Sequence, residues 1–168
     1  MLFTSVAPCL RCDVRRLRKR TVNSTVSISK RFREARERAG LSPDDAASGM
    51  GISGPCVWDI ETLDDEISSC YSIAAVQQFC DVLSIRPREL FGFESPVSPL
   101  TAASLARLIR EHCRLQSLTP EQFEDAAGWS VVKNLEEPER FRHDYPIDGI
   151  IDICRELGVD WQRFIESQ

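Results

Sequence analysis

The chain has 168 residues and a mass of 19.0 kDa, which suits one medium-sized domain or two small ones. With 42% hydrophobic and 28% charged residues it has an ordinary globular composition, which excludes collagen-like, low-complexity and wholly disordered chains. A net charge of -5 argues against a surface that binds nucleic acid everywhere, and the absence of any run of about 18 apolar residues excludes a transmembrane protein.

Residues 1–27 differ in charge from the rest of the chain. They carry six Lys and Arg against Asp13 alone, which leaves the body acidic in both of its halves. We expect this segment to be a poorly ordered leader that is dispensable for folding. Three interpretations stay open: an arm that binds DNA in the minor groove, an upstream start codon assigned in error before Val22 or Val26, and an organelle transit peptide.

The cysteines give no sign of disulfides or of metal. Seven of them at irregular spacing is an odd number, which is typical of a protein of the reducing cytoplasm. Cys9 and Cys12 form one C-x-x-C pair, whereas a structural zinc site needs four ligands, and no second pair follows. We therefore predict a cytoplasmic protein with neither a metal site nor a cofactor.

The chain contains an internal repeat. Residues 41–53 align with residues 118–130 at an offset of 77, and four pairs are identical: Leu41 and Leu118, Pro43 and Pro120, Gly51 and Gly128, Ser53 and Ser130. Downstream the offset falls to 75 and then to 74, where Cys80 aligns with Cys154. Each copy is thus a structural unit of some 65 to 70 residues.

Five short helices are predicted in the first copy. The first covers 29–39 and stops at Gly40, and the second starts at Pro43 behind Ser42 as its N-cap. Gly51 supplies the tight turn before the third helix, which Ser53 caps. The apolar residues of that helix, Val57, Ile60 and Leu63, are expected to point inward. The last two helices cover 73–83, behind Ser72, and 87–91.

The second copy repeats this scheme after a linker at 93–100, which is rich in Pro and Ser. The prediction is an all-α chain with domains at 28–92 and 101–168. Its expected core pairs equivalent residues: Phe32 and Ile109, Leu41 and Leu118, Ile52 and Trp129, Val57 and Val132, Ile60 and Leu135, Phe79 and Ile153, Leu83 and Leu157. Cys80 and Cys154 are expected to be buried equivalents, and Trp161 a core contact.

The run REARERAGLSPDDAASGMGISGPCVWDIE, with VQQFCDVLSIRPRELF after it, resembles the lambda-repressor-like (Cro/Xre-type) helix-turn-helix family. Residues 105–165 are similar to a second, more diverged member. The resemblance implies two five-helix helix-turn-helix domains in tandem and binding of double-stranded DNA, usually as a dimer. In this family helix 3 reads the bases in the major groove.

The family's functional positions differ in chemistry between the copies. On the expected outer face of the first helix 3 lie Gly54, Pro55, Trp58, Asp59 and Thr62, among which no Arg, Lys, Asn or Gln can read a base edge. In the second copy this face comprises Ser130, Val131, Lys133, Asn134 and Glu137. Lys133 and Asn134 can bind base edges, so the second copy is better suited to read DNA. Phosphates are expected to be held by helix N-termini, by Ser42 and Thr119, and by four arginines: Arg33, Arg36, Arg110 and Arg114. Ser53 is a further DNA-binding candidate.

Two functions follow from this pattern. The first is a DNA-binding transcription regulator that uses helix 3 of its domains. The alternative is a degenerate helix-turn-helix module, such as an antitoxin, immunity or accessory factor, that binds another protein or a second copy of itself through an exposed Trp58. No nucleophile, His and carboxylate share a catalytic spacing and no Gly-rich phosphate loop occurs, so an enzyme is not expected.

Overall fold

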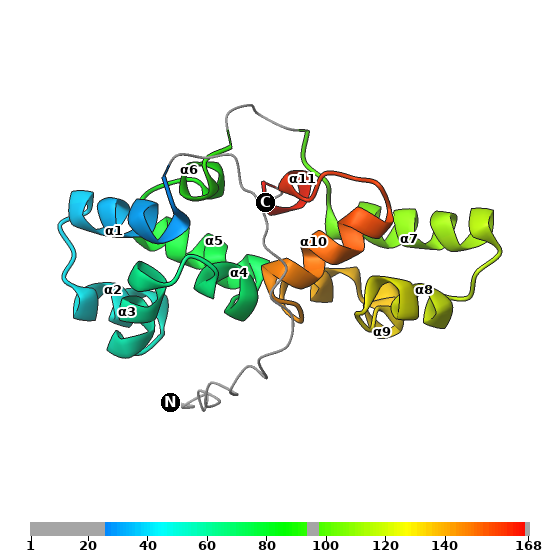
Figure 1. Cartoon of the computed structure of the whole chain (residues 1–168), viewed down its shortest axis with the longest axis horizontal. Coiled ribbons are helices and arrows are strands. Elements are labelled where there is room, and N and C mark those ends of the chain that lie inside the picture. Colours follow the sequence, from blue (N-terminus) through cyan, green and yellow to red (C-terminus); the bar gives the residue numbers. More distant parts are fainter. Residues whose placement is uncertain (1–25, 94–97, 167–168) are drawn as a thin grey trace.

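The computed structural model describes residues 26–93 and 98–166, and within these ranges the chain is helical with no β-strand (Figure 1). The predicted all-α class is therefore confirmed. The expectations about the leader, Cys9 and Cys12, and the centre of the linker concern 1–25 and 94–97, which lie outside the described residues.

The helices divide into a first half, 26–93, and a second half, 98–166. The first half contains α1 (Ile28–Arg38), α2 (Pro43–Met50), α3 (Gly54–Thr62), α4 (Glu66–Cys70), α5 (Ile73–Val82) and α6 (Pro87–Phe91). The second contains α7 (Ala102–Gln116), α8 (Pro120–Ala127), α9 (Val132–Glu136), the 3-10 helix η1 (Pro138–Arg142), α10 (Ile147–Glu156) and α11 (Gln162–Ile165).

The helix ends follow from local sequence signals. Ser42 accepts a hydrogen bond from the backbone of Asp45, whose carboxylate accepts one in return from the backbone of Ser42, so α2 starts with a capping box. Gly51 and Gly128 end α2 and α8 with φ of +70° and +75°, which a side chain would strain. Ser53 precedes α3 as predicted, but its side chain makes no capping bond.

Two short helices lie outside the five helices predicted for each copy. These are α4 in the first half and η1 in the second, and each buries one large apolar residue: Ile67 and Phe141. A helix of five residues has too few positions to show a periodic apolar pattern, so the sequence gives no signal for it. Burial of that single side chain against the core stabilises it instead.

The predicted core is largely confirmed. Buried as expected are Phe32, Val57, Ile60, Phe79, Cys80, Leu83, Ile109, Leu135, Ile153 and Cys154, while Leu41, Ile52, Trp129, Leu157 and Trp161 are half-buried and pack against the core. Burial raises the pKa of the Cys80 and Cys154 thiols to about 12, so both stay protonated at neutral pH. The prediction is wrong for Val132 and Leu118, which are half-buried but do not pack against the core; Val131 is buried in place of Val132.

The halves meet through equivalent residues of the repeat. Ser72 and Pro146, at the N-caps of α5 and α10, form an antiparallel bridge, and the Ile147 N–H donates to the Tyr71 carbonyl at 3.1 Å. At the offset of 74 Ser72 aligns with Pro146. Contact between equivalent positions is the geometry of a two-fold symmetric interface, here within one chain. As a result α3 and α9 lie along the same edge of the molecule, opposite α6 and α11 (Figure 1).

The start of α1 is held against the loop after α3. The Ser29 hydroxyl donates to Asp64 at 2.6 Å, and this bond holds the pKa of that carboxyl below its usual range. A lowered pKa stabilises the fold above the pKa of an unfolded aspartate, about 4, and the contribution disappears as the pH falls through the folded value. The chain therefore enters α1 beside an acidic loop.

We expect Ser29→Ala to lower the free energy of unfolding at pH 7 by less than about 1 kcal/mol, since Asp64 is exposed. The difference from the unmodified chain should shrink as the pH falls below about 4, because the protonated carboxyl no longer gains from the bond. Urea unfolding between pH 3 and pH 7 measures it. Ser48→Ala, at an exposed position of α2, should shift stability equally at every pH.

Candidate functional site

An exposed apolar surface lies on α3, and we call it the α3 surface: Pro55, Trp58, Thr62 and Leu63. Val57 and Ile60 are fully buried beneath the helix, so the opposite face, with Pro55, Trp58 and Thr62, points outward. Trp58 is 65% exposed, as the sequence analysis expected. An exposed Trp at the centre of a small face is typical of a protein-binding hot spot.

Leu63 corrects the expectation that it points inward. It is the C-cap of α3, with φ -114° and ψ 118°, and it is 47% exposed. Because the extended backbone leaves the helical turn at this residue, the side chain departs from the apolar stripe that Val57 and Ile60 follow. Leu63 thereby adds to the exposed apolar area at the C-terminal end of α3.

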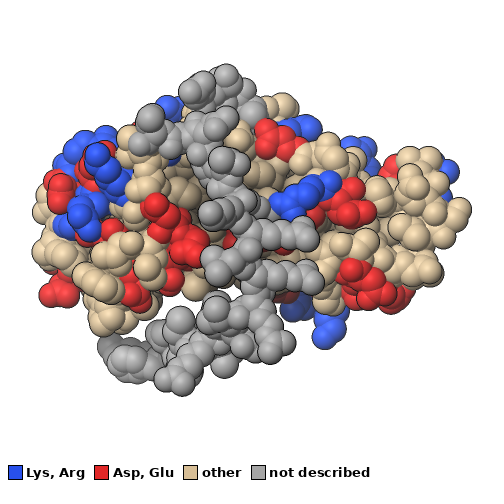
Figure 2. Space-filling view, viewed as in Figure 1, with Lys and Arg blue, Asp and Glu red and all other residues tan. Residues whose placement is uncertain are grey.

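The surroundings of the α3 surface are acidic. Residues 39–85, which include all of α2 to α5, contain no Lys, Arg or His and eight carboxylates: Asp44, Asp45, Asp59, Glu61, Asp64, Asp65, Glu66 and Asp81. In the first half, basic side chains gather over α1 (Figure 2). Two of them, Arg33 and Arg36, bind Glu61. A helix surface that approaches DNA normally carries the opposite charge.

The N-termini of both third helices already face carboxylates. A Cβ placed on Gly54 would lie 3.0 Å from Asp44 Oδ1, so this carboxylate stands at the start of α3. At the start of α9, Glu124 Oε1 accepts from the Val131 N–H at 2.5 Å and from the Val132 N–H at 2.8 Å. These are the sites where a helix dipole and free N–H groups would hold a phosphate.

The pKa of Glu124 reflects this arrangement. Desolvation by burial would raise it, but the bonds from the Val132 N–H, the Ser130 hydroxyl and the Val131 N–H together lower it below its usual range. The carboxylate is therefore charged at neutral pH and satisfies the N–H groups that the sequence analysis assigned to phosphate. No local sequence signal marks Glu124 or Asp44 for this place, because each comes from the preceding helix.

On α9 two of the expected outward residues are buried. Asn134 is 4% exposed, donates to Asp144 Oδ2 at 3.2 Å and accepts from the Tyr145 hydroxyl at 3.1 Å, while Val131 is fully buried. The reason is the starting point of the helix. By the alignment α9 should begin at Val131, yet it begins at Val132, and one residue rotates a helical face by about 100°. Among the residues expected on the outer face of this helix, three are exposed: Ser130, Lys133 and Glu137.

The four candidate arginines all bind groups of the protein itself. Arg36 is buried and pairs with Glu61 at 2.5 Å, and Arg33 reaches the same carboxylate at 3.2 Å. Arg110 donates to the Leu135 carbonyl at the end of α9. Arg114 pairs with Glu111 at 2.6 Å on the exposed side of α7, where both side chains remain open to solvent.

The other two tryptophans have structural roles, as predicted. Trp129 packs edge-on against Tyr145 and donates its Nε1–H to Asp152 at 3.3 Å. Trp161 packs edge-on against Phe91 and Phe93, with ring centroids 5.5 and 5.3 Å apart, and so joins the end of α6 to the start of α11. Only Trp58, among the three, presents its ring mainly to solvent.

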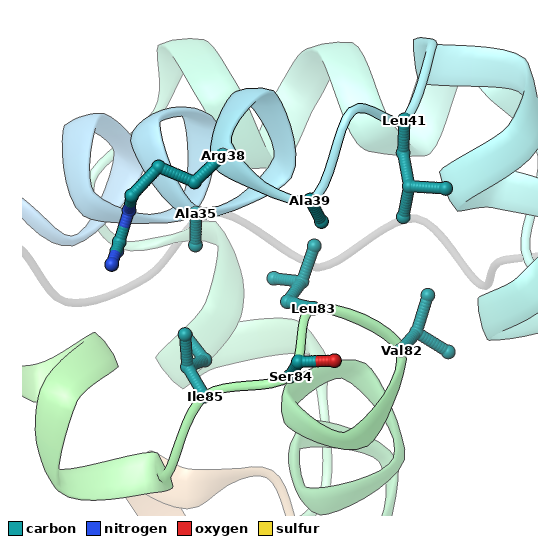
Figure 3. A pocket seen from close by; sticks show the side chains of 8 residues that line it. All are labelled: Ala35, Arg38, Ala39, Leu41, Val82, Leu83, Ser84 and Ile85. Carbon is teal, nitrogen blue, oxygen red and sulfur yellow. The ribbon is translucent and has the colours of Figure 1, made fainter.

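A shallow cavity of about 280 Å³ lies where the end of α1 meets the end of α5. Figure 3 shows Ala35, Ala39 and Leu41 on one side pointing toward the residues from the end of α5 on the other. Arg38 is the one charged residue of the lining, and its Nε–H donates to a carbonyl of its own helix. The volume is small for a ligand site, and the lining has no acid–base pair.

Comparisons with known proteins add no relative: no family model matches the chain, and no curated protein matches it. Among residues 26–93 and 98–166, no group of three or more His, Cys, Asp or Glu is placed to hold a metal ion. Within the same ranges, none of the helices combines the length and the apolar character needed to span a bilayer.

Proposed function

We propose that this chain is a protein-interaction module made of two helix-turn-helix-like units, and that it binds its partner through the α3 surface. The observation that carries the proposal is Trp58, 65% exposed on α3 with Leu63 at the end of the same helix. Large exposed apolar side chains grouped on one face mark binding sites more often than chance. A buried Trp at an interface typically supplies about 2 kcal/mol or more of the binding free energy.

The electrostatics favour a protein over DNA as the partner. Asp44 and Glu124 stand at the N-termini of α3 and α9, and no cation occurs between Ala39 and Ile85. Among the described residues, a phosphate that approached α3 would meet like charge, and the nearby Arg33 and Arg36 already bind Glu61. The acidic surroundings of the α3 surface instead suit a partner with Lys and Arg beside an apolar residue.

Site-specific photo-crosslinking in cells tests this proposal. Trp58 is replaced by the photoreactive aromatic residue p-benzoylphenylalanine, and the same residue at exposed Gln116 of α7 serves as the matched control. We expect position 58, and not position 116, to form a discrete crosslink to another protein that mass spectrometry identifies. Once the partner is known, Trp58→Ala should weaken binding by about 30-fold or more. Identical products from both positions would contradict the proposal.

A second candidate is DNA binding by the second half, as expected of a transcription regulator of the cytoplasm. It is favoured by one observation: Lys133 is exposed on α9 and Ser130 is exposed just before that helix, which lies along the same edge as α3 (Figure 1). A helix-turn-helix dimer places its two recognition helices on one side of the molecule to bind two half-sites, and α3 and α9 share this arrangement. Here one chain would supply both helices.

Fluorescence anisotropy with genomic DNA fragments at low salt tests this second candidate. If the second half binds DNA, affinity should fall with salt with a log-log slope of about -3 to -4, because few phosphates can be neutralised. Lys133→Ala should then lower affinity several-fold, whereas Lys30→Ala, at an exposed lysine of α1, should leave it unchanged. Absence of binding to every fragment would eliminate this candidate and leave the protein-interaction proposal.

A further inference from the structure

The α3 surface has no cover among the described residues, although it holds an exposed Trp inside an acidic stretch. Exposure of Trp58 and Leu63 to water is unfavourable. The carboxylates of residues 39–85, apart from Glu61, which is paired with Arg33 and Arg36, repel one another. A ligand that relieves both costs needs several cations and at least one apolar side chain. These two requirements define its chemistry.

One segment of the chain itself has this chemistry. Between 11 and 20 it carries six cations against Asp13, and Val14 and Leu17 stand among them; the cations are Arg11, Arg15, Arg16, Arg18, Lys19 and Arg20. No Lys or Arg occurs between 39 and 85, where the eight carboxylates lie. The two stretches are therefore the most basic and the most uniformly acidic parts of one chain.

The attachment of this segment places it within reach. The chain enters α1 beside the loop after α3, where the Ser29 hydroxyl binds Asp64 at 2.6 Å. The six residues 21–26 span up to about 20 Å when extended, and Trp58 lies only about 6 Å along the helix axis from Thr62, at the end of α3. A tether of this length gives an effective concentration on the order of millimolar.

We propose that the basic segment 11–20 docks in cis on the α3 surface and shields Trp58. The docked segment competes with any basic partner for the α3 surface. It uses the surface of the proposed function, but it does not depend on an external partner. Because the attraction acts between solvent-exposed charges, it weakens when salt shortens the Debye length from about 10 Å at 0.1 M to about 3 Å at 1 M.

Photo-crosslinking of the purified full-length chain tests this proposal. With p-benzoylphenylalanine at position 58, we expect crosslinks to residues 11–20 at 20 mM salt, and at least a five-fold loss of these crosslinks at 1 M salt. Replacement of Arg15, Arg16, Arg18, Lys19 and Arg20 by Gln should abolish them, whereas Arg107→Gln with Arg114→Gln on α7 should not. The photoreactive residue at position 116 should give no crosslink to the segment.

Mixing isotope-labelled and unlabelled chains distinguishes the segment's own chain from a second copy. Crosslinks within one isotope form support docking in cis, and crosslinks between forms overturn it. Absence of crosslinks to 11–20 at low salt also overturns it, provided that the melting temperature shows the labelled chain to be folded. The purified sample contains no partner, so this experiment does not test the proposed function. The crosslinking experiment in cells tests that function independently.

Discussion

Replacing Glu61 by Met is expected to lower the free energy of unfolding by about 3 to 5 kcal/mol, because the buried guanidinium of Arg36 is left without a neutralising charge. The side chains of Glu61 and Arg36 are each 10% exposed, and their closest N and O atoms are 2.5 Å apart. Arg36 keeps one bond to the protein, from Nη1 to the Leu41 carbonyl at 2.7 Å, but it loses the charge that neutralised it. Urea or thermal unfolding followed by circular dichroism measures the loss.

The double variant with Arg36→Met separates the cost of an unpaired charge from the loss of packing. Because it removes both charges, it should recover about 1 to 3 kcal/mol of what Glu61→Met alone loses. As a control, Glu34→Met breaks the exposed pair with Lys30 and should cost less than about 1 kcal/mol. If the buried and exposed variants lose equal stability, the Arg36–Glu61 pair has no special role.

Replacing Trp161 by Ala is expected to destabilise the chain by about 2 to 4 kcal/mol, slightly below the usual cost for a fully buried aromatic residue. Trp161 is half-buried, and its ring packs edge-on against Phe91 and Phe93 of the first half. Its loss opens a gap between α6 and α11, where the halves meet. Thermal unfolding measures the loss, and separation of one transition into two would show that this contact couples the halves.

Trp58→Ala is the matched control, since it removes the same side chain from an exposed position. It should change the free energy of unfolding by about 0.5 kcal/mol or less, because 65% of Trp58 is already in contact with water. Equal losses for the two variants would contradict both the structural role of Trp161 and the exposure of Trp58.

The sequence alone determined the helical class and most helix boundaries in the first half. Ser42, Pro43 and Gly51 carry their conformational preferences locally, so the start and the end of α2 could be predicted without any contact in the tertiary structure. The repeat likewise predicted that Cys80 and Cys154 are buried equivalents, since both fall on an amphipathic helix at the same register.

The tertiary structure decided the chemistry of the candidate site. Asn134 is buried because α9 begins one residue late, and Leu63 is exposed because the backbone becomes extended at that residue. A helical face turns by about 100° per residue, so an error of one position exchanges inside and outside. Asp44 and Glu124 reach the N-termini of α3 and α9 from preceding helices, and side-chain contacts of this kind follow from packing across a turn, which no local sequence preference encodes.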